Sequence, residues 1–157
     1  MLRRSLVTLA MLVSLPAAAV AGPFSFYGPH MGFSQGPDQL VVGGQLQWNG
    51  VAPRLAFVPG MDFGFADNRS TAQLNGDFHY NLSYDTAWQP YVGGGVAVTL
   101  WSDQAVGRAN VPEAGGSLIV GAAIFNRAGG RFFSEIKVGL GDSPELKLIA
   151  GWNHRGR

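Results

Sequence analysis

Residues 72–82 read AQLNGDFHYNL, and their side chains separate by odd and even position. The even positions are apolar apart from a glycine: Ala72, Leu74, Gly76, Phe78, Tyr80 and Leu82. The odd positions are all polar: Gln73, Asn75, Asp77, His79 and Asn81. Successive side chains of a β-strand point to opposite faces, whereas a helical period would mix the two sets. The segment therefore predicts a strand with one apolar and one polar face.

The same alternation recurs in seven further segments. They span residues 26–33, 39–49, 54–65, 91–101, 117–125, 132–140 and 145–153. Most of the connections between them carry turn residues such as Asn49-Gly50, and none has a helical period. Strands joined without crossover helices pair antiparallel. The sequence therefore predicts an all-β fold of eight antiparallel strands.

One segment conflicts locally with this pattern, because Pro59-Gly60 falls inside the third predicted strand. Pro-Gly is a turn signal, and proline lacks the N–H that a strand ladder uses. A hairpin there would leave two arms of about five residues, whereas a membrane strand needs about 9–11. We therefore expect one continuous strand with a bulge or kink at Pro59.

The composition is unlike that of an ordinary soluble domain. Of 157 residues, 23 are glycine and only 13% are charged, against about 25% charged in typical soluble domains. A formal net charge of +1 gives no basic field for nucleic acid. The absence of cysteine excludes disulfides, thiolate zinc sites and a thiol nucleophile.

Residues 1–21 have the features of a secretory signal peptide. Arg3 and Arg4 precede an apolar run over residues 6–15, and Ala19-Val20-Ala21 forms a small-residue cleavage site. The apolar run is shorter than the roughly 20 residues of a spanning helix. We expect export with cleavage after Ala21, which leaves residues 22–157 as one barrel domain.

Two architectures fit eight alternating strands. A soluble periplasmic barrel, like a lipocalin, would turn its apolar parity inward and bind an apolar ligand. A transmembrane barrel would turn that parity outward, against lipid. The polar parity is rich in Gly, Asn, Gln, Ser and Ala and poor in charge, unlike a solvated outer face. The sequence therefore favours an eight-stranded antiparallel up-and-down transmembrane β-barrel.

In that barrel the polar parity lines the lumen and plugs it, because side chains fill the interior of an eight-stranded barrel. Opposite charges on neighbouring strands are expected to pair, with Glu135, Lys137, Glu145 and Lys147 sharing one wall. The predicted polar lining consists of His30, Gln45, Gln47, Arg54, Asp62, Asn75, Asp77, His79, Glu135, Lys137, Glu145 and Lys147.

The four tryptophans fall at predicted strand ends. Trp48, Trp88 and Trp152 share one end of an up-and-down barrel, and Trp101 falls at the other. Aromatic girdles at both interfaces are typical of membrane barrels, so we expect these four residues to form them.

Residues 88–96, WQPYVGGGV, resemble the W-x-P-Y-V-G-x-G strand of small bacterial outer-membrane β-barrel proteins of the OmpA/OmpX/opacity type. The resemblance implies an outer-membrane location, termini in the periplasm and loops outside. Its implied partners are outer-membrane lipid, lipopolysaccharide and, during insertion, the barrel-assembly machinery, with a monomer as the expected state. Such barrels typically end in an aromatic residue, whereas this chain continues past Trp152 to Arg157.

We expect no catalytic residue, metal centre or cofactor. A lipid A deacylase of this architecture would show a His-x-Ser-Asn arrangement, but His79 is followed by Tyr80-Asn81. Ser83 lies four residues from His79, about 13 Å along a strand, which is too far for a nucleophile and its base. Gly93-Gly94-Gly95 opens no helix and so predicts no phosphate loop. Arg69 and Arg108 in external loops are candidates for contact with lipopolysaccharide phosphates, although ordinary solvated arginine is the simpler interpretation.

Overall fold

A computed structural model describes residues 25–67, 69–83, 87–103, 112–125 and 129–156. The predicted signal peptide and Arg108 lie outside these ranges. Eight strands follow in order: β1 (Phe26–Gln35), β2 (Gln39–Ala52), β3 (Leu55–Ala66), β4 (Arg69–Asn81), β5 (Trp88–Asp103), β6 (Pro112–Phe125), β7 (Arg131–Gly141) and β8 (Leu146–Arg155). All eight strands predicted from the alternation are confirmed, and most are longer than expected.

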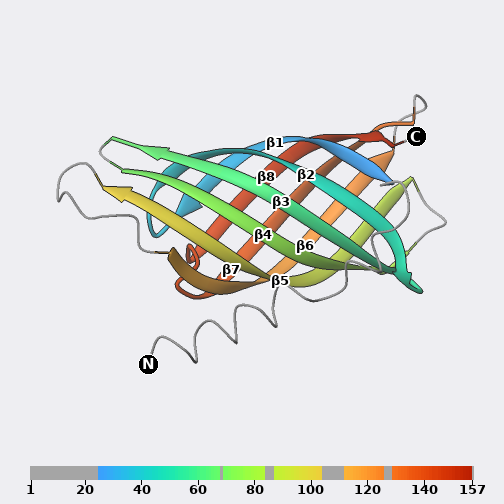
Figure 1. Cartoon of the computed structure of the whole chain (residues 1–157). Coiled ribbons are helices and arrows are strands. Elements are labelled where there is room, and N and C mark those ends of the chain that lie inside the picture. The colour runs from blue at the N-terminus through green and yellow to red at the C-terminus, as the bar shows by residue number, and fades with distance from the viewer. Residues whose placement is uncertain (1–24, 68, 84–86, 104–111, 126–128, 157) are drawn as a thin grey trace.

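The strands form one closed barrel in sequence order, with β1 paired antiparallel to both β2 and β8 (Figure 1). Closure leaves no free sheet edge. The strands run from 10 to 16 residues, long enough for tilted strands to cross a bilayer. We call the end where β1 begins and β8 ends the terminal end, and the opposite end the distal end. In the described ranges no helix is both long and apolar enough to span a membrane.

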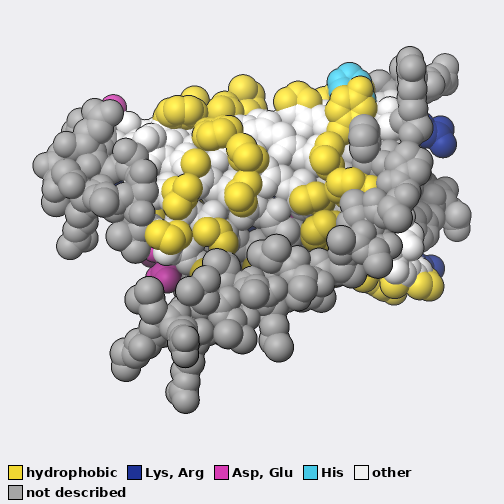
Figure 2. Space-filling model, in the orientation of Figure 1, with side chains coloured by type: hydrophobic (Ala, Val, Ile, Leu, Met, Phe, Trp, Pro, Cys, Tyr) yellow, Lys and Arg dark blue, Asp and Glu magenta, His cyan; other side chains and the backbone are white. Residues whose placement is uncertain are grey.

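The two side-chain parities lie on opposite faces of the barrel wall. Large apolar side chains from every strand point outward and stay exposed, including Leu74, Val120 at 60% and Leu148. On the face shown in Figure 2, hydrophobic side chains cover the wall between the two ends. A soluble barrel needs the reverse arrangement, so the lipocalin-like interpretation is excluded by the orientation of the faces. The fold is an eight-stranded antiparallel up-and-down transmembrane β-barrel.

Strand β3 runs without a break through Pro59, which confirms a single strand. The expected bulge at that residue is wrong. The β2–β3 register is the same on both sides of Pro59, with Gln45 opposite Gly60 and Trp48 opposite Phe57. At Pro59 the ladder is interrupted between those two pairs without a change of register, because proline has no N–H to donate. The register shifts elsewhere, between Asn49 and Ala52.

That shift leads into a two-residue turn at Pro53-Arg54 between β2 and β3. Arg54 has a φ of 65°, in the left-handed region. Proline at the first central position and a positive φ at the second fit a type II turn, which favours glycine where Arg54 stands. Arg54 is exposed at the terminal end, so it is not the lumen-lining residue predicted from sequence.

Candidate functional site in the barrel lumen

Asp62 of β3 is the centre of a hydrogen-bonded cluster in the distal half of the lumen. Its Oδ1 lies 2.6 Å from His30 Nε2 of β1. Its Oδ2 accepts hydrogen bonds from Asn75 Nδ2 at 2.9 Å and from Lys147 Nζ of β8 at 2.8 Å. Strands β1, β3, β4 and β8 are therefore tied together through one carboxylate.

Lys147 and Gln73 extend this cluster. Lys147 also donates to Gln73 Oε1, and Gln73 Nε2 donates to Thr99 Oγ1 of β5 at 2.8 Å. The buried ammonium thus has two oxygen partners from two strands. Because a buried polar group is costly without partners, the extension stabilises the charged centre.

A second cluster forms around Glu135 of β7. Tyr91 of β5 donates its hydroxyl hydrogen to Glu135 Oε1 at 2.8 Å, and its ring stacks on His79 with centroids 4.6 Å apart. Lys137 Nζ lies 3.7 Å from Glu135 Oε2 and 2.5 Å from Asp77 Oδ2 of β4. Lys137 therefore bridges two carboxylates on opposite walls of the barrel.

The buried charges of the described residues balance. They are three carboxylates and three cations: Asp62, Asp77, Glu135, Arg131, Lys137 and Lys147. Arg131 lies over the Phe26 ring at 4.1 Å, a cation–π contact near the terminal end. Burying charge is tolerable only when it is compensated, so the lumen is assembled as a neutral unit.

An apolar cluster fills the lumen beside the polar clusters. It consists of Tyr91, Ile119, Ala123, Phe133 and Ile149. Phe133 and Ile119 are each only 1% exposed. Packed rings and aliphatic side chains thus occupy the lumen together with the ion pairs.

The structure places ten of the twelve predicted lining residues inside the barrel. Nine are buried, namely His30, Gln45, Gln47, Asp62, Asp77, His79, Glu135, Lys137 and Lys147, and Asn75 is half-buried. Arg54 and Glu145 are exposed and lie outside the lumen. Both precede the first residue of a strand, at Leu55 and Leu146, so the alternation no longer fixes their direction.

The partners of the lumen charges also differ from the sequence-based expectation. The sequence predicts ion pairs along one wall, among Glu135, Lys137, Glu145 and Lys147. Instead Lys137 reaches Asp77 and Lys147 reaches Asp62, both across the barrel. Parity identifies which side chains face inward. The distance between two side chains on opposite walls depends on how the barrel closes, so parity does not identify the ion-pair partners.

Three tryptophans lie as expected for a girdle, and one does not. Trp48, Trp88 and Trp152 are on the outward parity at the terminal end, where Trp48 stacks on Phe57 with centroids 6.4 Å apart. Trp101 lies at the distal end but shares the inward parity of Thr99, and its Nε1 is buried. Its position on β5 therefore contradicts a lipid-facing girdle role.

Sequence reasoning missed several lumen residues. Gln39, Gln73, Thr99 and Arg131 are all buried inside the barrel. Parity could have found all four, because Gln39 matches Gln45, Gln73 matches Asp77, Thr99 matches Ala97 and Arg131 matches Glu135. The predicted lining leaves them out, since an isolated polar side chain or a strand-end Arg carries no pairing signal.

Both histidines of the lumen are in contact with neighbouring side chains. His30 contacts Asp62 and Phe133, His79 contacts Glu135 and Tyr91, and both imidazoles are less than 10% exposed. Over the ranges described, no group of three or more His, Asp or Glu is placed to hold a metal ion. The clusters join strands through contacts between buried side chains.

Structural comparison places this geometry among solved barrels. Neisserial surface protein A matches with 10% identity over 86% of this chain and 97% of its own, at a TM-score of 0.66. The N-terminal β-barrel domain of Pseudomonas aeruginosa OprF matches with 9% identity over 84% and 98%, at a TM-score of 0.67. The chain has the fold of the small outer-membrane β-barrels.

Another barrel of this fold is an enzyme. The outer membrane enzyme PagL matches with 14% identity over 83% of this chain and 99% of its own, at a TM-score of 0.52. Fold alone therefore does not decide between an enzyme and a non-catalytic barrel. No protein-family model matches the sequence, and no curated protein matches it significantly.

Proposed function

We propose that this protein is a non-catalytic barrel of the bacterial outer membrane, with a lumen plugged by side chains and a structural or loop-mediated role. The observation that carries the proposal is the neutral set of buried charges that ties opposite walls together. Lys137–Asp77 and Lys147–Asp62 each join strands that are not neighbours in the sheet. Such bridges close the lumen and hold the barrel in one shape.

The same contacts argue against an enzyme. A general base must reach the proton of a substrate or nucleophile. His30 and His79 instead face buried carboxylates and aromatic rings, at 7% and 3% exposure. Their positions support a role in packing the lumen.

Planar-bilayer recording tests the plug directly. The purified protein, reconstituted alone, is expected to give no stable open channel at moderate voltage. The double variant Lys137→Ala/Lys147→Ala, which removes both bridges, is expected to give measurable leak. Sustained conductance by the wild type, equal to that of the variant, would overturn the proposed plug.

Location is tested separately by fractionation of the native host membranes. An outer-membrane barrel is expected to sediment with the outer-membrane fraction and to migrate faster in gels when unheated. Recovery in the periplasmic fraction without detergent would contradict the proposed location.

A further inference from the structure

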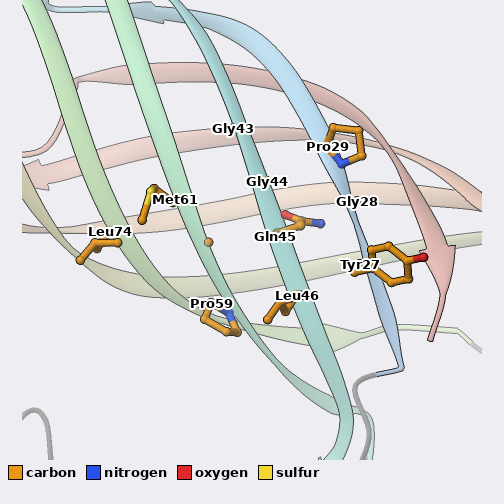
Figure 3. Close-up of a pocket in the computed structure, with 11 residues that line it drawn as sticks. Tyr27, Gly28, Pro29, Gly43, Gly44, Gln45, Leu46, Pro59, Met61 and Leu74 are labelled. Carbon is orange, nitrogen blue, oxygen red and sulfur yellow. The ribbon is translucent and has the colours of Figure 1, made fainter. Parts of the chain in front are cut away.

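The outer wall carries a groove that interrupts the apolar belt. Its cavity volume is about 550 Å³, and its lining spans β1 to β4. Figure 3 shows the side chains of Tyr27, Pro29, Leu46, Pro59 and Met61 standing around Gly43 and Gly44, where the wall has no side chain. The volume is within the range of sites that hold small molecules.

Local sequence explains why the groove exists. Gly44 takes the outward position between Pro29 of β1 and Met61 of β3 in the strand register. Two prolines near Gly44 interrupt a ladder: Pro29 falls between the β1–β8 pairs Tyr27–His154 and His30–Gly151, and Pro59, two residues from Met61, interrupts β2–β3. Gly44 has no side chain and the two proline rings are compact, so the wall is hollow here.

At Gly44 the floor of the groove has space for a side chain. A Cβ built on Gly44 would meet only the Gly28 carbonyl oxygen, at 3.6 Å, which is ordinary contact. Gly43, by contrast, points inward, and a Cβ there would contact His30 and Asp62. Gly44 is therefore dispensable for the lumen clusters but decides whether the groove is open.

The groove extends towards the terminal end of the barrel. Tyr27 lines it, and its ring lies tilted against that of His154, with centroids 5.8 Å apart. Tyrosine and tryptophan mark the interface of a membrane protein, and Trp48 and Trp152 lie at the same end. The next residue, Arg155, shares the inward parity of Asn153, but it is the last residue of β8 and is exposed at the rim, where Figure 2 shows Lys and Arg side chains.

We propose that this groove binds one acyl chain of an anionic phospholipid, with the phosphate near His154 and Arg155. The apolar hollow takes the chain, and the exposed cationic rim provides charge complementarity for the phosphate. Hydrocarbon surrounds this belt in a bilayer, so a chain fills the hollow without desolvating any polar group. The ligand comes from the leaflet at the terminal end.

Native mass spectrometry after mild extraction from vesicles tests the site. The vesicles contain equal phosphatidylglycerol and phosphatidylethanolamine. The wild type is expected to retain one phosphatidylglycerol. Gly44→Leu, which fills the groove, is expected to lose at least tenfold of that retention. Gly94→Leu is the matched control, since Gly94 is an outward glycine on β5 whose Cβ would meet only the Ser117 carbonyl oxygen, at 3.3 Å.

A second variant separates chain from headgroup. His154→Ser/Arg155→Ser is expected to keep lipid bound but to lose the preference for phosphatidylglycerol over phosphatidylethanolamine. Unheated gel migration confirms that each variant is folded. Equal lipid retention by the wild type and Gly44→Leu would overturn the proposal. A dimer mass abolished by Gly44→Leu would overturn it in favour of a second copy of this chain.

Discussion

Lys137 of β7 and Lys147 of β8 are direct register partners, and both side chains point into the lumen. Like charges directly opposite each other on adjacent strands destabilise a sheet. Here each ammonium turns to a different carboxylate, Asp77 for Lys137 and Asp62 for Lys147. The two aspartates lie on β4 and β3, on the far side of the barrel. The repulsion of one strand pair is thus offset by attraction across the lumen.

We predict that Lys137→Ala destabilises the barrel by about 3–5 kcal/mol, because it leaves the Asp77 carboxylate buried without its cation. The double variant Lys137→Ala/Asp77→Ala is expected to recover part of that loss. Urea unfolding in vesicles, followed by the intrinsic tryptophan signal, measures both. Strictly additive effects of the two substitutions would show that the two charges do not interact.

Glu145 provides the matched control for this cycle. Its side chain is a carboxylate like that of Asp77, but it lies outside the lumen just before β8. Glu145→Ala is expected to change the free energy of unfolding by less than about 1 kcal/mol, as for exposed charges. If Glu145→Ala lowered the free energy of unfolding as much as Lys137→Ala, Glu145 could not be in water while Lys137 is in the lumen.

Val120 and Gly121 are neighbours on β6 that face lipid and lumen respectively. Val120→Arg is expected to cost about 2–4 kcal/mol in a bilayer, the cost of a cation on the lipid face near mid-membrane. Gly121→Ala is expected to cost about 1–3 kcal/mol by overpacking, because its new Cβ would collide with the Tyr91 ring. Unfolding of both variants in vesicles measures these costs.

Spin labelling provides an independent check on Val120. The chain has no cysteine, so Val120→Cys creates a unique labelling position. A nitroxide there is expected to be accessible to oxygen and shielded from water-soluble relaxation agents. Preferential access by the water-soluble agent would mean that the barrel faces are reversed.

Sequence alone predicted the strand count and the face of most residues, because alternation is a local property of each strand. Residues 72–82 show this well: Asp77 and His79 point inward as their parity requires. The failures occur where strands end. In the sequence Arg54 and Glu145 fit the polar parity of the strands that follow them, but both lie in turns and are exposed to solvent.

The choice of ion-pair partner could not be predicted in the same way. Lys137 and Asp77 are 60 residues apart, and no local pattern links them. Their contact depends on the stagger with which β7 and β4 face each other after closure. Sequence alternation predicts contacts between neighbouring strands of a sheet, and it carries no signal for contacts across the lumen.

Arg54→Gly is predicted to stabilise the barrel slightly, by up to about 1 kcal/mol. A left-handed φ costs a residue with a Cβ about 1–2 kcal/mol, and glycine relieves that strain while losing more entropy on folding. Thermal or urea unfolding measures the difference. Arg54→Ala, which keeps the Cβ, is the control and is expected to be close to neutral. A Gly variant less stable than the Ala variant would show that the entropy cost of glycine outweighs the relief of strain at this φ. An Ala variant clearly less stable than the wild type would show that the Arg54 hydrogen bond to the Leu82 carbonyl contributes to stability.

Tyr91→Phe tests the second lumen cluster with the removal of one oxygen atom. The Tyr91 hydroxyl donates to Glu135 Oε1 at 2.8 Å, while its ring packs on His79 and within the apolar cluster. Phenylalanine keeps the ring but removes a hydrogen bond to a buried carboxylate, so we expect a loss of about 1.5–3 kcal/mol. Tyr80→Phe is the matched control, since Tyr80 is the outward-facing tyrosine on neighbouring β4 and is 44% exposed. It is expected to be neutral to within about 0.5 kcal/mol. Equal effects of the two substitutions would mean that the Glu135 carboxylate does not depend on Tyr91 for its stability in the lumen.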